Sequence, residues 1–217
     1  MTRQQGVRDL IGAARALEPW GCFPATDGNL SVRVTKEKIL VTKSGVSKAN
    51  LRAVDFVLQD LRGEKRKDVS SEWPMHRTIY LARPETNCIL HVHAPFLTAF
   101  AVAHRIPNRR LLSEARMAVG EIVLVSYAAP GSEELGHLVI KAGRSAAIYL
   151  LANHGAVAVG KDVPEALCVL ERAEFLARME LLSESLGGGR LLPQENGNST
   201  EKKSAARTSK TAKRTAA

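Results

Sequence analysis

Short apolar segments of strand length alternate irregularly with helical patterns along most of this chain. The predicted strands are residues 30–34, 38–42, 55–61, 88–94, 121–127, 146–152 and 156–160. The predicted helices are residues 7–17, 70–83, 96–104, 133–140 and 163–185. Strands must pair in a sheet, and each amphipathic helix must bury its apolar stripe against another element. This order therefore predicts an α/β protein in which helices cover both faces of one sheet.

The length and composition suit one folded domain with a tail. A chain of 217 residues with 45% hydrophobic residues can bury a core. No apolar run reaches the roughly 18 residues of a membrane span, and the N-terminal residues lack the apolar core of a signal peptide. The three cysteines form no CxxC pair, which favours a reducing cytoplasm over a disulfide framework.

The formal net charge of +9 is concentrated near the C-terminus, where residues 198–217 hold six Lys and Arg residues and one Glu. This segment is rich in Lys, Ala, Thr and Ser and has no large apolar residue with which to form a core. We therefore predict a folded domain over residues 1–189 and a basic, disordered tail over residues 190–217. A nucleic-acid-binding function would depend on this tail alone and is the least favoured function.

A His-x-His pattern ends the apolar segment that begins at Cys88 and stops at Pro95. On a strand, His91 and His93 point to the same face, and two neutral imidazoles on one face can bind a single ion. His154, at the end of a predicted buried strand, would complete a three-histidine site with an open position, which is typical of catalytic zinc. The alternatives are polar residues on the solvent side of a strand and a His154 bonded to a backbone carbonyl.

Glu72 is the candidate carboxylate for this site. It lies in the first turn of the predicted helix that begins at Ser70. A carboxylate beside a metal can serve as a fourth ligand or as a general base. An acidic residue in a first helical turn is equally typical of plain capping.

Three polar segments predict an anion site. Backbone N–H groups, hydroxyls and amides of this kind suit a phosphate monoester, and a helix N-terminus attracts anions. Neither a P-loop nor a GxGxxG pattern is present, so a nucleotide is not favoured. Each segment alone could be a simple turn. The candidate residues are Asn29, Ser44, Gly45, Ser70 and Ser71.

Taken together, these segments resemble the class II aldolase/adducin family, and within it the fuculose phosphate aldolases. The matching segments are residues 28–33, 44–45, 70–76, 91–94, 127–135 and 153–155, in the family's order and spacing. The resemblance covers roughly residues 5–185. It implies a three-layer α/β/α domain with a large mixed, mostly antiparallel sheet.

The resemblance also implies a role for each candidate residue. The zinc ligands would be His91, His93 and His154, with Glu72 as the catalytic residue and a further ligand. Another divalent metal could replace the zinc. The phosphate of the substrate would bind to Asn29, Ser44, Gly45, Ser70 and Ser71. The family works as a homotetramer with active sites between subunits.

The implied reaction is the zinc-dependent cleavage of a ketose 1-phosphate similar to L-fuculose 1-phosphate. The products would be dihydroxyacetone phosphate and an aldehyde, formed through a metal-stabilised enediolate. Fuculose phosphate aldolases protonate the aldehyde oxygen with a tyrosine from a neighbouring subunit. This chain has no tyrosine between Arg105 and Gly120, so the part of the site that handles the aldehyde is expected to differ.

Other members of the family leave alternatives open. The alternative enzyme is a related metal-dependent sugar-phosphate dehydratase, decarboxylase or 4-epimerase. The 4-epimerases have Asp where this chain has Glu72, which favours the aldolase. A non-enzymatic, adducin-like interaction module is disfavoured because the three histidines and Glu72 are all present.

Overall fold

The structure is a computed structural model that describes residues 1–194. The helices are α1 (Arg3–Leu17), α2 (Trp73–Ala82), α3 (Pro95–Val102), α4 (Ser113–Ala118), α5 (Glu133–Ala142) and α6 (Val163–Glu184). The strands are β1 (Asn29–Arg33), β2 (Lys38–Thr42), β3 (Phe56–Asp60), β4 (Cys88–Val92), β5 (Ile122–Val125), β6 (Ile148–Leu151) and β7 (Gly155–Gly160). Short 3-10 turns are η1 (Glu18–Trp20), η2 (Lys48–Asn50), η3 (Ala53–Asp55) and η4 (Arg109–Leu111). Most of the tail predicted for residues 190–217 lies outside the described residues.

The strands form one seven-stranded sheet in the order β3-β2-β1-β4-β7-β6-β5. Neighbouring strands β5 and β6 run parallel, and all the other adjacent pairs of this sheet run antiparallel. The predicted mixed, mostly antiparallel sheet is thus confirmed. β4 is the central strand, with Asn29 of β1 opposite His91 and Val157 of β7 on the other side. The strand that leads into the His-x-His pattern is therefore hydrogen-bonded to a neighbouring strand on each side.

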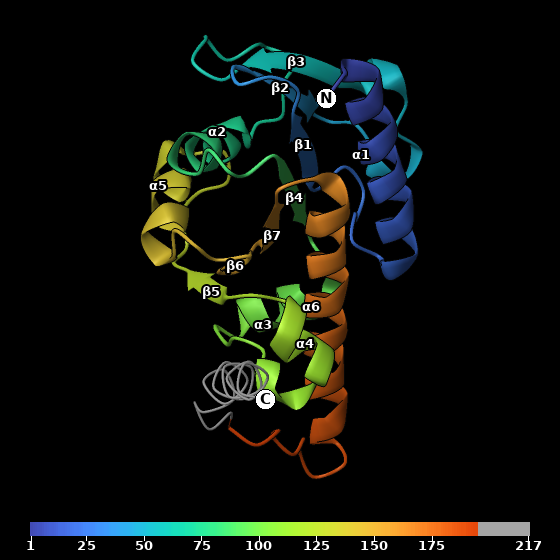
Figure 1. The fold of residues 1–217 in the computed structure, drawn as a ribbon, viewed down its shortest axis with the longest axis vertical. Coiled ribbons are helices and arrows are strands. Elements are labelled where there is room, and N and C mark those ends of the chain that lie inside the picture. The colour runs from blue at the N-terminus through green and yellow to red at the C-terminus, as the bar shows by residue number, and fades with distance from the viewer. Residues whose placement is uncertain (195–217) are drawn as a thin grey trace, which may run out of the picture.

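Helices cover both faces of the sheet, as predicted, and give three layers (Figure 1). α2 and α5 lie on one face, whereas α1, α3 and α6 lie on the other. Because side chains alternate along a strand, Leu90 packs with the second group of helices and Ile89 with the first. His91 shares the face of Ile89, which directs it towards the N-terminal end of α2.

Two local predictions differ from the structure. The helix predicted to begin at Ser70 begins at Trp73, so Glu72 occupies its N-cap position rather than its first turn, and the Glu72 side chain makes no capping hydrogen bond. Pro74 at the second helical position suits a helix that starts immediately before it. The short helix α4 was not predicted, because Ala115 is its one buried residue and it has no periodic apolar stripe.

The search for a membrane-spanning helix is negative for the described part of the chain. None of its helices is both long and apolar enough to cross a bilayer.

Candidate metal and substrate site

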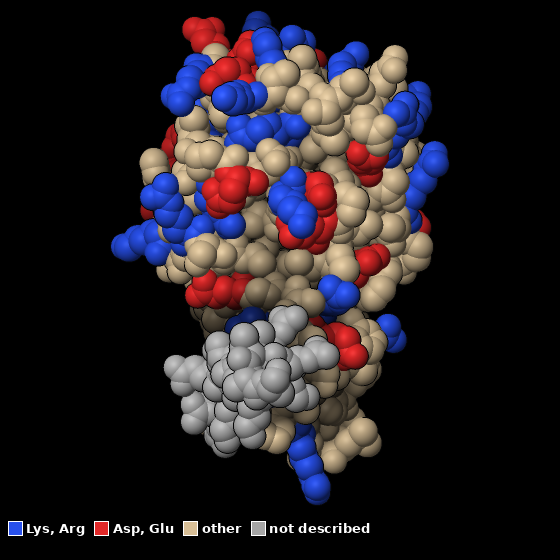
Figure 2. Space-filling model, viewed as in Figure 1, with Lys and Arg blue, Asp and Glu red and all other residues tan. Residues whose placement is uncertain are grey.

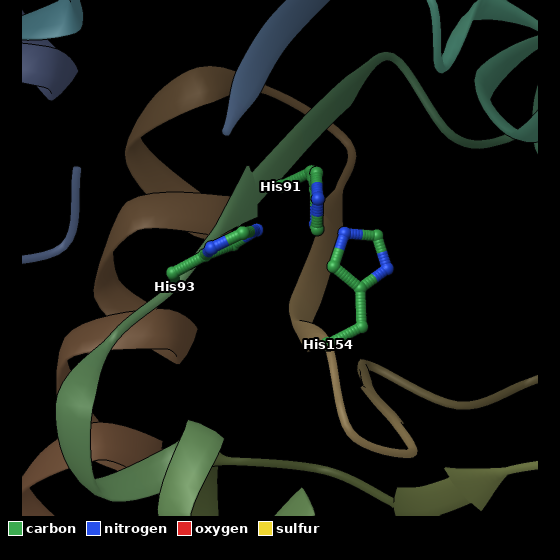
Figure 3. Close-up of side chains that lie close together, drawn as sticks. All are labelled: His91, His93 and His154. Carbon is green, nitrogen blue, oxygen red and sulfur yellow. The ribbon is translucent and has the colours of Figure 1, made fainter. Parts of the chain in front are cut away.

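The structure brings the three candidate histidines together at one end of the sheet. His91 is in β4, His93 directly follows that strand, and His154 lies in the turn between β6 and β7. One ligand nitrogen from each lies within 4.8 Å of the others. Figure 3 shows the three rings converging from the two segments. A spacing of this size suits three ligands around a single metal ion, each at roughly 2.0–2.1 Å for zinc.

The turn that carries His154 depends on the residues on either side of it. Asn153 adopts a left-handed conformation, with φ of 57°, which asparagine tolerates better than most residues. Its Oδ1 lies 2.8 Å from Nε2 of His104. A Cβ atom at Gly155 would lie 2.7 Å from the Val92 carbonyl oxygen and 2.8 Å from the His93 ring. Only glycine therefore lets the turn approach β4 closely enough to bring His154 beside His93.

The Glu72 carboxylate and the His91 ring face each other with two hydrogen-bond acceptors. Nδ1 of His91 donates a hydrogen bond to the Ala156 carbonyl oxygen at 3.1 Å, so the neutral ring presents the lone pair of Nε2 on its other side. The Nε2 atom lies 3.2 Å from Oε2 of Glu72, with its lone pair on that side of the ring. Two acceptors at this distance repel each other unless a proton or a metal ion lies between or beside them.

The surroundings of Glu72 also support a metal at this place. Oε2 of Glu72 and Nδ1 of His154 are both buried and have no hydrogen-bond partner among the described residues. Oε1 of Glu72 lies 3.7 Å from Nε2 of His154. Unsatisfied buried polar atoms are costly, and a divalent cation bound to Nε2 of the His154 ring would satisfy the Glu72 oxygen. The residues present therefore fit a divalent metal held by three nitrogens with a carboxylate within reach.

The electrostatic environment keeps the imidazoles neutral. Burial lowers the pKa of His154 to about 4, and it also lowers the pKa values of His91 and His93. Burial raises the pKa of Glu72 to about 7, against the effect of a hydrogen bond from the Gly131 backbone. At neutral pH the three rings therefore have lone pairs available for a metal, because neutral imidazole is the form that binds one.

The candidate phosphate-binding residues line the same cavity as the metal site. This cavity has a volume of about 430 Å³. Asn29 and Ser70 are buried, whereas Ser44, Gly45 and Ser71 are exposed. Every residue that the sequence predicted for the site, from the three histidines and Glu72 to these five, borders this one cavity.

A buried hydrogen-bond chain orients Asn29. Oδ1 of Asn29 lies 2.6 Å from Nε2 of His76, and Nδ1 of His76 lies 2.7 Å from Oγ of Ser31. Ser31 Oγ lies in turn 2.9 Å from the Tyr80 hydroxyl. Burial lowers the pKa of His76 to about 3, so its ring is neutral, donates from one nitrogen and accepts at the other. If it donates to Asn29, the amide N–H₂ of Asn29 is the end left for a ligand. His76 is therefore a structural residue, because it is fully buried and both of its ring nitrogens have partners.

Four charged or hydroxyl residues at the cavity were missed by sequence reasoning: Thr26, Asp27, Lys43 and Lys48. Oδ2 of Asp27 lies 3.4 Å from Nδ1 of His93. A carboxylate behind a metal-binding histidine fixes the ring orientation and raises the basicity of the ligand. The position of Asp27 just before Gly28 and Asn29 was the one available signal. Lys48 had none, because lysine is usually a surface residue.

Glu174 of α6 holds the segment that follows His93. α3 begins at Pro95, and its N-cap residue Ala94 offers no capping side chain. The carboxylate of Glu174 takes this place, because it accepts hydrogen bonds from the backbone N–H groups of Phe96 at 2.9 Å and Leu97 at 2.8 Å. The side chain is buried. A contact between distant helices thus fixes where the His-x-His segment leaves the sheet.

Replacing Glu174 by alanine is expected to lower the free energy of unfolding by about 2–4 kcal/mol, because one buried and one part-buried N–H group lose a charged acceptor. Urea denaturation measures this loss. Glu171→Ala on the same helix is the matched control and should cost far less, because no hydrogen bond to the Glu171 side chain is found among the described residues. Equal losses in the two variants would contradict the capping role of Glu174.

A family model described as the class II aldolase and adducin N-terminal domain matches residues 8–181. The chain belongs to this family. The prediction of the family from the sequence is confirmed, as is the prediction of an enzyme of the class II aldolase type. Class II aldolases depend on a metal, and the three histidines are the candidate metal site in this member.

Individual relatives span most of the chain. It is 35% identical over 190 residues to the 5-methylthioribulose-1-phosphate/5-deoxyribulose-1-phosphate aldolase of Rhodospirillum rubrum, covering 86% of this chain and 85% of that protein. It is 30% identical over 158 residues to the 3-oxo-tetronate 4-phosphate decarboxylase of Haemophilus influenzae, covering 70% of this chain and 75% of that protein. The solved structure of the L-fuculose-1-phosphate aldolase of Thermus thermophilus matches with a TM-score of 0.75 and 30% identity, over 85% of this chain and 97% of that one. These three relatives are named for different phosphorylated compounds.

Proposed function

We propose that this protein is a zinc-dependent aldolase that cleaves a ketose 1-phosphate to dihydroxyacetone phosphate and an aldehyde. The observation that carries the proposal is the buried Glu72 carboxylate facing the lone pair of His91 beside two further histidines. Three neutral histidines and an open position are the donor set of many catalytic zinc sites. The similar aldolases act on ketose 1-phosphates by name, which is the substrate class we propose here.

Different residues of this chain would bind the phosphate, hold the metal and transfer the proton. The hydroxyls of Ser44, Ser70 and Ser71, with the amide of Asn29, would bind the phosphate and fix the position of the reacting carbon. A divalent ion held by the three histidines would act as a Lewis acid towards the substrate carbonyl. Glu72 would transfer the proton at that carbon, since burial with a pKa near 7 makes it both a usable base and a usable acid at neutral pH.

The described part of the site has no tyrosine that could protonate the oxygen of the aldehyde product. No tyrosine borders the cavity within the part of the chain that the structure describes. We propose that water, or a group from a neighbouring subunit, protonates the aldehyde oxygen. A homotetramer with active sites between subunits would supply such a group. The tetramer, the cytoplasmic location and zinc as the metal in the cell stay predictions.

Decarboxylation of a phosphorylated keto acid is the second candidate. The similar decarboxylase acts on a phosphorylated compound, and loss of CO₂ beside a carbonyl leaves the same type of negative charge as aldol cleavage. A nucleic-acid-binding function has less support. Figure 2 shows Lys and Arg interspersed with Asp and Glu over the face that it draws, whereas nucleic-acid binding calls for a basic patch or stripe.

A substrate screen distinguishes these reactions. Purified protein loaded with zinc is expected to release dihydroxyacetone phosphate from at least one of L-fuculose 1-phosphate, 5-methylthioribulose 1-phosphate and 5-deoxyribulose 1-phosphate. A chelator should stop the release, and added zinc should restore it. The same protein is assayed for CO₂ release from 3-oxo-tetronate 4-phosphate. Release of CO₂ alone would replace the aldolase by the decarboxylase, and no metal-dependent release from any compound would contradict both.

A further inference from the structure

Lys48 is a buried cation at the wall of the catalytic cavity. It is the first residue of η2 and is only 2% exposed. Its ammonium group donates hydrogen bonds to the carbonyl oxygens of Thr26 and of Val46, the latter at 2.8 Å. These bonds join the segment that leads to Asn29 with the loop that follows Ser44 and Gly45. Lys48 thus connects two of the three segments proposed to bind phosphate.

The charge of Lys48 has no counterion within the described residues. No carboxylate of residues 1–194 lies within ion-pair distance of its Nζ atom, and its two partners are neutral carbonyls. A buried charge without an opposite charge is costly. Burial accordingly lowers the pKa of Lys48 to about 8, although the Asp27 carboxylate acts in the opposite direction. The ammonium remains mostly protonated at neutral pH and would be stabilised by an anion.

One of its three donors remains for that anion. An ammonium group has three N–H bonds, and the described residues use two of them. Lys48 borders the same cavity as Ser44, Gly45, Ser70 and Ser71. The carbonyls of Thr26 and Val46 hold the nitrogen in place, so the third N–H is pre-positioned before a ligand arrives.

We propose that Lys48 binds the phosphate group of the substrate directly, through its third N–H. This inference rests on the proposed function, because it assigns a further residue to the phosphate part of that site. The serine hydroxyls and backbone N–H groups are neutral donors, so Lys48 supplies the buried positive charge of the phosphate site. A hydrogen bond between two charged groups is roughly twice as strong as one between neutral groups.

The test uses zinc-loaded, full-length protein and inorganic phosphate as the probe, with binding measured by calorimetry. Lys48→Met is expected to weaken phosphate binding by about 10- to 100-fold, as loss of a charged hydrogen bond predicts. Its zinc content should stay within error of the wild type. Lys38→Met is the matched control, since Lys38 is a half-exposed surface residue paired with Asp60, and it should bind phosphate like the wild type. Equal binding by Lys48→Met and the wild type would overturn the proposal, as would a wild type that binds no phosphate.

A second measurement needs no variant and applies even if Lys48→Met does not fold. The side-chain ammonium signals of ¹⁵N-labelled wild-type protein are recorded by NMR with and without phosphate. Phosphate should shift the Lys48 signal and leave the Lys38 signal unaffected. An unchanged Lys48 signal at saturating phosphate would overturn the proposal. A protein that binds phosphate through Lys48 but cleaves no ketose phosphate would contradict the proposed function alone, which keeps the two failures distinct.

Discussion

Replacing Glu72 by glutamine is expected to lower kcat for ketose-phosphate cleavage by about 10²- to 10⁴-fold, the usual contribution of a general acid or base. The amide keeps the size of the side chain but cannot transfer a proton. Glu72 lies 3.2 Å from His91 and 3.7 Å from His154, and its Oε2 has no hydrogen-bond partner among the described residues. No contact of the fold described here therefore depends on that oxygen, and the variant should fold.

The measurement combines steady-state kinetics with zinc content and thermal unfolding. Retained zinc with lost turnover would assign Glu72 as the proton-transfer group, whereas lost zinc would make it mainly a ligand. Glu134→Gln is the matched control, because Glu134 is exposed on α5, and it should keep wild-type kcat. Undiminished turnover in Glu72→Gln would remove Glu72 from the mechanism.

Replacing His93 by alanine is expected to remove most of the metal and with it the activity. The site would keep two nitrogens of three, and the loss in affinity should exceed the roughly 10- to 100-fold cost of losing an outer partner of a ligand. Because His93 is partly exposed at the end of β4, its loss should perturb the core far less than the loss of a buried apolar residue.

Metal content after dialysis, measured by elemental mass spectrometry, checks this expectation. The wild type should hold about one divalent ion per chain, or take one up when zinc is added. His137→Ala, an exposed histidine on α5, is the matched control and should hold as much metal as the wild type. A wild type that neither contains nor takes up a metal would contradict the zinc site, and equal metal in His93→Ala would exclude His93 as a ligand.

Much of the fold could be predicted from local patterns. Short apolar segments located all seven strands to within a few residues, because both faces of the sheet pack against a hydrophobic core. The period of two along a strand placed His91 and His93 on one side of β4. The long helix α6 and the amphipathic α5 were predicted for the same reason, since each has an apolar stripe to bury. Short α4, with one buried residue, has no such signal.

The candidate site was predicted less evenly. The candidate metal and phosphate residues could be proposed from the sequence, because histidines, serines and glycines in particular patterns indicate such chemistry, and the structure places them around one cavity. Asp27 and Lys48 were missed, because a single charged residue in a loop is ordinarily a surface residue. Glu174 was missed for a different reason. It is 78 residues away from the backbone group at Phe96 that it caps, and nothing local to either segment indicates the contact.

The sequence by itself determined the elements, the family and the residue types that the site needs, because these depend on patterns within a few residues. Only the tertiary structure decided where the Glu72 side chain points. Locally it was as consistent with a helix cap as with a catalytic group, and the structure leaves its carboxylate uncapped and aims it at His91. The order of strands alone brings β1, β4 and β7 side by side, and it gathers into one cavity side chains that are up to 128 positions apart, from Thr26 to His154. Strand pairing and helix packing bring together residues that are this far apart in the sequence, and no local pattern encodes those contacts.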